Sequence, residues 1–600
     1  MKLPPRALGI PFLLVLIATT ASAQVTERAS LSSTSIQGNG DSQTPCVSAD
    51  GRYLAFESRA ANLVPGDTNG ESDVFVRDRQ LGTTQRVSVS SSGAQGDGQG
   101  SFGAAITPDG RYVAFLSYST NLVTGDTNGR IDAFVRDRQL GTTERISVAT
   151  GGAQGNGDCD DGVSISTDGR YVAFASAASN LVAGDTNGFQ DIFVRDRVGG
   201  TTERTTGYTG GFQGNADSHD PFLSGGARYV TFRSGASNLI TGDTNGVDDV
   251  FVFDRHTGTT QRVSIDSNVG QGNGSAVGRP TISSDGRLVA FSSLASNLVS
   301  GDTNGTSDVF LRDRIAGTTQ RIDLGPGGAQ ANAGSPSCFV SSDGQHVAYS
   351  SLASNLVAGD TNGQQDVFVH DTATGTTQRA SVSSSGAQGN AASDGPALSA
   401  GGQFVVFASS ATNLVSGDTN GQPDAFARDR GPAGFASLCS PGLAGVIPCP
   451  CSNPPSGPGR GCNNSSGTGG AILLAGGVAD LSADNLVLLT SGERPTALSI
   501  VAQWVGLNPA GAVFGMGVRC TSGAFERLYS RTAVGGSISV PSFAAGDLSI
   551  SAQSAARGNT IFAGQSRWYV VYYRDPSVLG GCPATSNFNT TQTAQVTWSP

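Results

Sequence analysis

The chain has 600 residues, of which 84 are glycine and only 14% are charged, and its formal net charge is -11. Lys2 is the only lysine, which excludes a P-loop and Schiff-base chemistry in the rest of the chain, because both need a lysine side chain. An acidic chain without a basic tract also argues against nucleic acid as a partner, since that binding depends on phosphate neutralisation.

Residues 1–23 have the pattern of a secretory signal peptide. Lys2 and Arg6 precede an apolar run from Ile10 to Ile17, and Ala-Ser-Ala supplies the small-residue cleavage site. This run is too short to span a membrane, and no later run reaches the roughly 20 apolar residues of a transmembrane helix. We therefore expect a soluble mature chain that is periplasmic or secreted.

Residues 24–430 consist of a repeat with an interval of 58 or 59 residues. Every copy contains the motif G-D-T-N-G-x-x-D, and self-similarity at a fixed period makes each motif one copy of a structural unit. The opening aspartate, asparagine and closing aspartate of the seven copies are Asp67, Asn69, Asp73; Asp126, Asn128, Asp132; Asp185, Asn187, Asp191; Asp243, Asn245, Asp249; Asp302, Asn304, Asp308; Asp360, Asn362, Asp366; and Asp418, Asn420, Asp424.

Each copy has the strand pattern of one blade of a propeller. Short segments rich in Val, Phe and Ile alternate with Asp-Gly and Gly-Thr turns, which predicts four strands, A to D. In the second copy, strand A lies near Ile106 and strands B, C and D lie in Arg111–Ser117, Asp132–Asp137 and Thr142–Val148. Four-stranded sheets repeated around a channel are the β-propeller architecture, so the repeats predict an all-β, seven-bladed propeller.

The two ends of the array predict how the ring closes. The seventh copy has strands A to C but no strand D after Asp429. The missing pattern stands at the N-terminal end, where Thr26–Leu31 matches Thr143–Val148. We expect this segment to add the outermost strand of the seventh blade, which removes the exposed edges of a linear array.

The repeat also resembles a known family. The run Pro280–Ser293, P-x-I-S-x-D-G-R-x-V-A-F-x-S, followed by D-V-F-V-R-D, is similar to TolB-type, WD-like propeller repeats. The resemblance covers residues 24–430 and implies the propeller fold, in a family whose uses range from protein docking to gating of hydrolase domains. Two departures from the family are the lack of a TolB-like domain before the ring and a longer B–C connection.

Strand parity places the B–C and D–A connections on one face of the ring. The B–C loop carries the G-D-T-N-G-x-x-D motif. The D–A loops carry Gln37-Gly-Asn39, Gln95-Gly-Asp97, Gln154-Gly-Asn156, Gln213-Gly-Asn215, Gln271-Gly-Asn273, Gln330-Ala-Asn332 and Gln388-Gly-Asn390. Loops on a rigid scaffold are where binding usually resides, so we expect a protein or glycan ligand on this face.

The motif admits two interpretations. Asp67, Asn69, Gly70 and Asp73 fit positions three, five, six and nine of an EF-hand-type calcium loop, although Pro65 replaces the usual first aspartate. Backbone carbonyls, water or the D–A loop would then complete a Ca²⁺ site. Alternatively, the Asp and Asn side chains cap a metal-free turn, in which Asn-Gly takes left-handed conformations. The sequence leaves both open.

Other repeated polar residues are given structural roles. The aspartate that ends strand C, such as Asp78, and the arginine of strand D, such as Arg86, are predicted to form cross-strand ion pairs. Asn62, five residues before the first motif aspartate, is predicted to cap the loop.

No catalytic constellation can be identified. The four histidines, His219, His256, His346 and His370, are scattered over different blades and strands, and neither H-E-x-x-H nor G-x-S-x-G occurs. His219 with Asp217 and Asp220 is the one local break in the symmetry of the loop face, and it is interpreted as an irregular loop. The sequence therefore predicts a protein that is not an enzyme. The alternative is a calcium-dependent propeller hydrolase, lactonase- or glycosidase-like, that uses the same face.

The cysteines are distributed unevenly. Cys46, Cys159 and Cys338 lie singly in the repeats. Six others crowd into the last third of the chain: Cys439, Cys449, Cys451, Cys462, Cys520 and Cys582. In an exported chain these six predict disulfide bonds, and the spacing without C-x-x-C or a nearby histidine does not favour zinc.

The C-terminal third has two predicted parts. Residues 431–469 form a connector rich in Cys, Pro and Gly, and residues 470–600 show about eight strand-like runs of a disulfide-bonded, β-sandwich-like domain. Trp568–Tyr573 is apolar on both faces, which predicts a central buried strand rather than an aromatic sugar platform. Taken together, the sequence predicts an exported, monomeric, non-enzymatic binding or scaffold protein.

Overall fold

The structure is a computed structural model in which the propeller and parts of the C-terminal region are described. The described residues are 24–208, 212–372, 374–430, 435–438, 471–476, 486–491, 493, 496–514, 517–533, 538–542, 547–562, 565–574, 588–591 and 593–598. The chain forms two compact units, one from Gln24 to Ala433 and one over the region that begins at Gly434. Each is described by itself. The predicted signal peptide, 1–23, lies outside the described residues.

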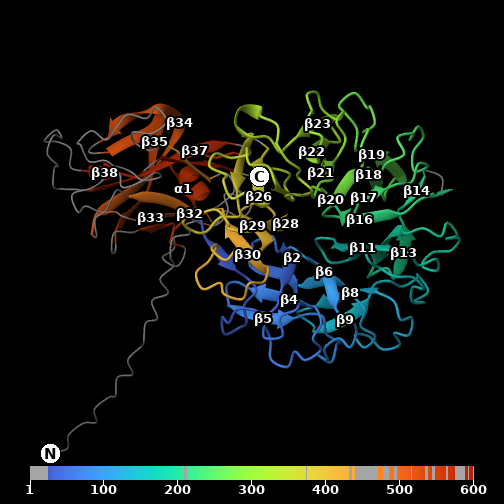
Figure 1. The fold of residues 1–600 in the computed structure, drawn as a ribbon. Helices are drawn as coiled ribbons and strands as arrows, with labels where there is room; N and C mark the ends of the chain where they lie inside the picture. The colour runs from blue at the N-terminus through green and yellow to red at the C-terminus, as the bar shows by residue number, and fades with distance from the viewer. Residues whose placement is uncertain are drawn as a thin grey trace, which may run out of the picture. The chain divides into compact units, whose positions relative to one another are not determined.

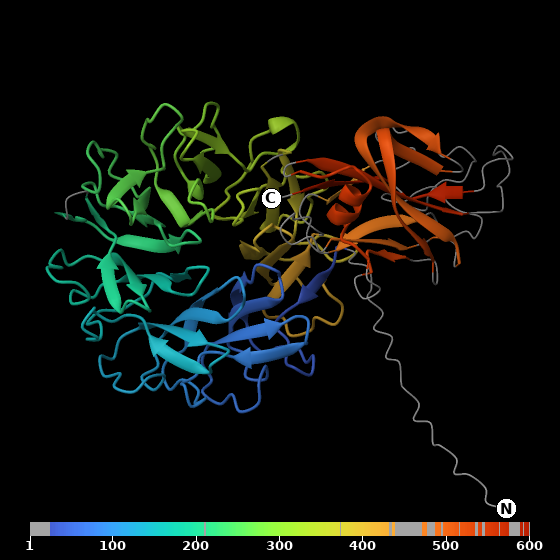
Figure 2. The ribbon, with the colours of Figure 1, turned by 180° about the vertical axis from the view of Figure 1, so that it is seen from behind.

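The first unit is a ring of seven four-stranded antiparallel sheets (Figures 1 and 2). Blades 1 to 3, from the inner to the outer strand, are β2 (Ser42–Val47), β3 (Tyr53–Ser58), β4 (Asp73–Asp78), β5 (Thr83–Arg86); β6 (Ser101–Ile106), β7 (Tyr112–Ser117), β8 (Asp132–Asp137), β9 (Thr142–Arg145); and β10 (Val163–Ile165), β11 (Tyr171–Ser176), β12 (Asp191–Asp196), β13 (Thr201–Arg204).

The remaining blades repeat this order. Blades 4 to 7 are β16 (Ser218–Leu223), β17 (Tyr229–Ser234), β18 (Asp249–Asp254), β19 (Thr259–Arg262); β20 (Ala276–Ile282), β21 (Leu288–Ser293), β22 (Asp308–Asp313), β23 (Thr318–Arg321); β24 (Ser337–Val340), β25 (His346–Ser351), β26 (Asp366–Asp371), β27 (Thr376–Arg379); and β28 (Ser393–Leu398), β29 (Phe404–Ser409), β30 (Asp424–Asp429), β1 (Thr26–Arg28). A short hairpin, β14 (Gly207–Tyr208) and β15 (Phe212–Gln213), and a 3₁₀ turn, Pro326–Gly328, lie between blades.

The N-terminal strand closes the ring, as the sequence predicts. β1 pairs antiparallel with β30, with Thr26 opposite Arg428 and Arg28 opposite Phe426. The seventh blade therefore takes three strands from the end of the array and its outermost strand from the beginning. The seven-bladed, all-β architecture is confirmed.

The cores of the ring lie between neighbouring blades. Strand B of blade 1 sends Phe56 to the side of blade 7 and Ala55 to the side of blade 2, because successive side chains of a strand point to opposite faces. Phe56 stacks on Phe75 of the next strand with ring centroids 5.9 Å apart, and the same position holds an aromatic pair in every blade. Each blade is thus covered on both faces by its neighbours.

The inner strands are irregular at one repeated position. A register shift interrupts the A–B pairing in blades 1, 2, 4, 5 and 7, and Gly103 in blade 2 has a φ of 66° at this bulge. In blade 2 the shift lies between Phe102 and Ala105. In blade 5 it runs from Val277 to Thr281, so β20 is one residue longer than β6 and the extra length lies at the bulge.

The C-terminal unit is built on two sheets. The larger has the order β31 (Phe435–Leu438), β39 (Thr593–Thr597), β37 (Ser566–Arg574), β34 (Leu498–Phe514), β35 (Gly517–Thr532), with β38 (Phe588–Thr590) paired to β37; the smaller has β32 (Ile472–Gly476), β33 (Val487–Ser491) and β36 (Ser539–Val540). A short helix, α1 (Ile550–Ala556), accompanies them. Trp598, Tyr569 and Tyr573 are buried in one core cluster.

Some C-terminal predictions hold and others need correction. The run Trp568–Tyr573 lies in β37, between β39 and β34, so the prediction of a central strand is confirmed. Phe435–Leu438 falls inside the predicted connector but forms β31, because it pairs with β39. Helix α1 was not predicted; it begins after Ser549, whose hydroxyl accepts a hydrogen bond from the Ala552 N–H.

The predicted disulfides fall outside what can be described. The side chains of the six C-terminal cysteines are not among the described residues, and in the propeller Cys46, Cys159 and Cys338 are free thiols. Among the described residues, no helix has the length and apolar character to cross a membrane.

Candidate functional site

The G-D-T-N-G-x-x-D motif forms a carboxylate–guanidinium–carboxylate cluster. In blade 1, Nη1 of Arg86 on β5 lies 3.0 Å from Oδ1 of Asp67 and 3.0 Å from Oδ2 of Asp73. All three side chains are at most 10% exposed. The B–C loop is therefore folded back onto strand D of its own blade by a nearly buried ion triplet.

The same cluster occurs in all seven blades, with N–O distances from 2.9 to 3.6 Å. The triplets are Asp67–Arg86–Asp73, Asp126–Arg145–Asp132, Asp185–Arg204–Asp191, Asp243–Arg262–Asp249, Asp302–Arg321–Asp308, Asp360–Arg379–Asp366 and Asp418–Arg28–Asp424.

The predicted pair between Asp78 and Arg86 is wrong. Register places Arg86 opposite Phe75 and Asp78 opposite Thr83, so the arginine lies nearer to Asp73 than to Asp78. Asp78 instead binds Arg52 of the A–B turn, with Nη2 2.8 Å from Oδ2. In blade 1 the two charge systems thus lie at opposite ends of the sheet.

The remaining polar atoms of the motif are also engaged. Asn69 donates from Nδ2 to Oδ2 of Asp73 at 3.2 Å, and its Oδ1 accepts from the backbone N–H of Glu71. Ser88 donates to Oδ1 of Asp73 at 2.5 Å. Burial, and then the neighbouring Asp73 carboxylate, raise the pKa of Asp67.

These contacts do not fit a calcium site. Calcium needs six to eight oxygen ligands, but the arginine lies between the two carboxylates, and the Asn69 amide presents nitrogen rather than oxygen to Asp73. Among the described residues, no group of three or more His, Cys, Asp or Glu side chains is arranged to hold a metal ion. Calcium binding at the 21 motif residues stays a prediction.

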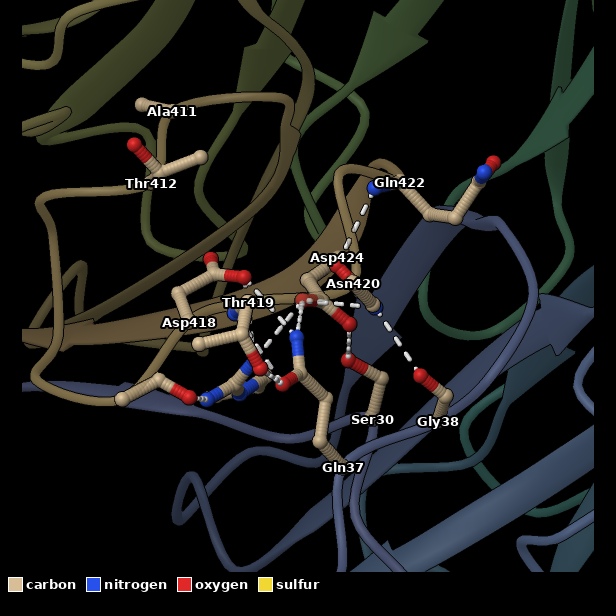
Figure 3. Close-up of polar contacts among 12 residues, drawn as sticks. Ser30, Gln37, Gly38, Ala411, Thr412, Asp418, Thr419, Asn420, Gln422 and Asp424 are labelled. Atoms are coloured by element: carbon tan, nitrogen blue, oxygen red, sulfur yellow. Dashed lines mark hydrogen bonds and ion pairs between the residues drawn. The ribbon is translucent and has the colours of Figure 1, made fainter.

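The D–A loops lie beside the motif loops, as strand parity predicts. Figure 3 shows this contact where the ring closes: Gln37 donates from Nε2 to Oδ1 of Asp418 at 2.8 Å, and Asn420 donates to the carbonyl of Gly38 at 2.9 Å. Ser30 also donates to Oδ1 of Asp424. The glutamine of each D–A loop thus binds the motif of the preceding blade.

The other end of each D–A loop binds the following blade. In blade 1, the Asn39 N–H donates to Oδ1 of Asn62 at 3.0 Å, and Asn62 donates back from Nδ2 to the carbonyl of Gln37 at 2.8 Å. The side-chain donation recurs in all blades, from Asn121, Asn180, Asn238, Asn297, Asn355 and Asn413. The predicted capping role is therefore a link between neighbouring blades.

Blade 5 departs from this pattern. Asp323 stands where blade 1 has Ser88, and its side chain is buried near Asp308, with a hydrogen bond of 2.7 Å from Ser335 to Oδ2. Burial, and then the charge of Asp308, raise the pKa of Asp323 well above its usual value. Blade 5 thus holds a third carboxyl group beside Asp308 of its ion triplet.

A cavity of about 380 Å³ opens on the loop face between blades 1 and 2. Its lining includes Asp41, Glu57, Arg59, Phe102 and Tyr118. Glu57 accepts a hydrogen bond of 3.1 Å from the backbone N–H of Gly103, and burial raises its pKa. The rings of Phe102 and Tyr118 lie 6.0 Å apart at 44°.

This lining is not repeated around the ring. The position of Glu57 is occupied in blades 2 to 7 by Leu116, Ala175, Arg233, Ser292, Ser350 and Ala408. Glu57 was missed because the sequence reasoning followed the repeated residues. The signal that could have revealed it is that Glu57 is the only carboxylate at this position, where every other blade except that of Arg233 has an uncharged residue.

A second break in symmetry lies at the channel mouth, by which we mean the loop-face ends of the inner strands of blades 3 to 5. His219 does not pair with Asp217 or Asp220. Its Nδ1 lies 2.5 Å from Oδ2 of Asp161, in the neighbouring blade. Asp217 accepts from the Gln190 N–H at 2.8 Å, whereas Asp220 binds Arg233 at 3.2 Å. The interpretation of His219 as part of an irregular loop therefore gives way to a hydrogen bond between blades.

Arg279, at the elongated bulge of β20, reaches the inner strands of the two preceding blades. Its Nη2 donates to the carbonyls of Val163 in blade 3 and Pro221 in blade 4, each at 2.6 Å, and the guanidinium lies over the ring of Phe222. Toward the other face lies a cavity of about 120 Å³, lined by inner-strand ends such as Ile106 and Leu398 together with hydroxyl side chains such as Ser164.

Comparisons with known proteins agree on the fold. No family model and no curated protein sequence matches the chain. Among solved structures, the chain is similar to oligogalacturonate lyase from Vibrio parahaemolyticus (12% identity, 68% of this chain and 98% of that chain, TM-score 0.42). It is also similar to TolB from Acinetobacter baumannii (17%, 58% and 65%, 0.32) and to Pyrococcus horikoshii acylaminoacyl peptidase (10%, 65% and 51%, 0.39). The TolB-like propeller resemblance is confirmed at the level of the fold.

These neighbours correct one prediction. The sequence predicted that the chain is not an enzyme, but the similar structures include an oligogalacturonate lyase and an acylaminoacyl peptidase. The regular repeats concealed unlike residues that meet between blades, of which Asp161 and His219 are an example.

Proposed function

We propose that the protein is an exported propeller that binds a glycan on its loop face, in the cavity between blades 1 and 2. One observation carries the proposal. The cavity of about 380 Å³ lies where the lining departs from the repeat, and it brings a half-buried carboxylate, Glu57, together with two aromatic rings. This volume falls within the roughly 300–1,000 Å³ of small-molecule sites.

The chemistry of the lining suits a sugar. Asp41 and Glu57 supply acceptors, whereas Arg59 and Gln43 supply donors, and a sugar hydroxyl both donates and accepts. Tyr118 is 41% exposed, so its ring offers an apolar face with a polar hydroxyl at its edge. A lining with both signs of charge suits a neutral, polyhydroxylated ligand better than an ion.

The repeated loops supply the rigid frame for this site. The motif side chains are bound to Arg86 and its equivalents, and the D–A loops link each blade to the next. Sites are held best when the supporting residues are themselves fixed by hydrogen bonds. The repeated face thus supports the proposal as scaffold, while the residues that bind are the unrepeated ones.

The proposal is tested with a glycan array followed by calorimetry on the purified chain. Tyr118→Ala and Glu57→Gln should each weaken binding of a recognised oligosaccharide at least tenfold, with unchanged melting temperature. Phe189→Ala is the matched control, because Phe189 is an aromatic residue of the loop face, 39% exposed, in the motif loop of blade 3. No glycan binding by the wild type, or equal loss in the control, would refute the proposal.

A further inference from the structure

The channel mouth contains an imidazole whose orientation is fixed from one side only. Nδ1 of His219 lies 2.5 Å from Oδ2 of Asp161, and Gln190 donates from Nε2 to the same oxygen at 2.7 Å. Among the described residues, Nε2 of His219 has no hydrogen-bond partner, and the side chain is 27% exposed. A carboxylate therefore holds one ring nitrogen while the other is available to solvent.

The pairing depends on the inner-strand irregularities. In blade 3 the Cys159 N–H donates to the carbonyl of Ile131, and in blade 2 the Ser101 N–H donates to the carbonyl of Ser72, so Cys159 and Ser101 occupy equivalent positions. The stretch from Cys159 to Ile165 is nevertheless one residue longer than the stretch from Ser101 to Ile106. The extra residue lies beside Asp161. In blade 4, Asp220 has a φ of 58°, within the bulge that follows His219.

The charged side chains around the pair are mainly carboxylates. Asp220 and Asp248 are both bound to Arg233, at 3.2 and 2.6 Å, and the side chain of Asp160 is exposed. The hydrogen bond from His219 lowers the pKa of Asp161, and the same bond raises the pKa of His219. The surroundings are acidic, so they disfavour an anionic substrate.

Arg279 binds the backbone that follows each member of the pair. It donates to the carbonyls of Val163 and Pro221, which lie two residues after Asp161 and His219 respectively. Its Nε is buried and has no hydrogen-bond partner among the described residues. This guanidinium therefore ties the inner strands of blades 3 and 4 together directly after Asp161 and His219.

We propose that His219 is the general base of a hydrolytic site for uncharged carboxylic esters and lactones at the channel mouth. Nε2 takes a proton from water as the water oxygen bonds to the carbonyl carbon. The bond from that carbon to the alcohol oxygen then breaks, and the imidazolium returns the proton to the departing alkoxide. Asp161 and Gln190 are positioning residues, which hold the ring with Nε2 toward the substrate. Ester cleavage needs only this one base, whereas glycoside cleavage needs a pair of carboxyl groups.

The test compares two histidine variants of the full chain. Hydrolysis of neutral aryl esters and lactones should fall about 100-fold or more in His219→Gln, in line with the roughly 10²–10⁴-fold contribution of general bases. His256→Gln is the control, because His256 is exposed on a C–D turn and should leave the rate unchanged. A wild-type rate no greater than that of free imidazole, or equal rates in both variants, would overturn the proposal.

A second measurement distinguishes positioning from a structural role. Asp161→Asn should lower kcat more than it raises KM, and should move the acid limb of the pH profile because the imidazole loses its carboxylate partner. Nitrogen NMR of the wild type should show Nδ1 protonated at neutral pH, and a neutral ring protonated on Nε2 would contradict the geometry. These readouts involve none of the residues tested for glycan binding, so the two proposals fail independently.

Discussion

Arg28 donates to Asp424, 396 residues further along the chain, at 3.0 Å. In every other blade the equivalent pair is local, as between Arg86 and Asp73, which are 13 residues apart. The closing strand therefore supplies both backbone pairing and the cation that the seventh motif needs. The motif of blade 7 is complete only when the two ends of the array meet.

Removal of residues 24–31 should destabilise the ring and promote association. The deletion exposes the edge of β30 and leaves Asp418 and Asp424 without Arg28. Exposed strand edges pair with other chains. Melting temperature and light scattering after size exclusion measure the effect, and a monomer of unchanged melting temperature would contradict the closure.

The ion triplets should matter more than the exposed pairs. Arg262→Gln leaves Asp243 and Asp249 buried without their cation, so the free energy of unfolding should fall by about 3–5 kcal/mol. Arg287→Gln breaks a pair whose arginine is 53% exposed, so water already screens the charge and the free energy of unfolding should fall much less. Urea unfolding midpoints measure both losses; equal losses would show that burial of the triplet is not the cause.

Calcium should leave the stability of the ring unchanged. The guanidinium already lies between the motif carboxylates, so the loops gain no partner from the ion. We expect no heat in a calcium titration and no shift in melting temperature after treatment with a chelator. A melting temperature that rises with calcium concentration in the millimolar range would support the calcium-loop interpretation instead.

Asp323→Ser should stabilise the protein at neutral pH. The folded state raises the pKa of Asp323 above its usual 3.8, so the native chain binds this proton more tightly than the unfolded chain does. The free energy of unfolding therefore falls as pH rises from 3.8 through the native pKa. The variant has no carboxyl group at this position, so its free energy of unfolding does not fall for this reason. Melting temperatures of variant and wild type should converge below that window.

The reverse substitution in blade 1 supplies the control for Asp323. Ser88→Asp should place a carboxyl group beside Asp73 and lower the melting temperature at neutral pH, less so in acid. If both changes have the same sign, the proximity of Asp308 does not explain the behaviour of Asp323.

Gly110→Ala should cost more than Gly129→Ala. Both glycines have positive φ, 71° and 62°, so either alanine carries a left-handed penalty of about 1–2 kcal/mol. A Cβ at Gly110 would also lie 2.1 Å from Cδ2 of Tyr53 in the neighbouring blade, whereas none of the heavy atoms compared lies within 4 Å of one at Gly129. Equal unfolding midpoints would show that the blades can separate enough to admit the methyl group.

The sequence predicts the ring well because its signals are local. Strand alternation, the Asp-Gly turns and the match of Thr26–Leu31 to strand D fix the blades, their order and the closure. The partner of Asp73 was not predictable in the same way. Which of two nearby carboxylates an arginine reaches depends on register, and Arg86 pairs opposite Phe75 rather than Asp78.

The channel mouth was harder to predict because it depends on length differences between repeats. Asp161 and His219 are 58 residues apart and become neighbours through an insertion in one inner strand and a bulge in the next. A pattern drawn from all seven repeats does not show an insertion or a bulge that occurs in one blade. Glu57 was missed for the same reason, since its position has no shared residue type across the blades.

The elongated β20 shows where this ring accommodates an additional residue. Its extra residue leaves the pairing of β21 with β22 in the same six-pair register as that of β7 with β8, so the added length is absorbed inside the channel. An inner strand of this ring can therefore gain a residue, and with it a new side chain at the channel, without a change in the pairing of the strands outside it.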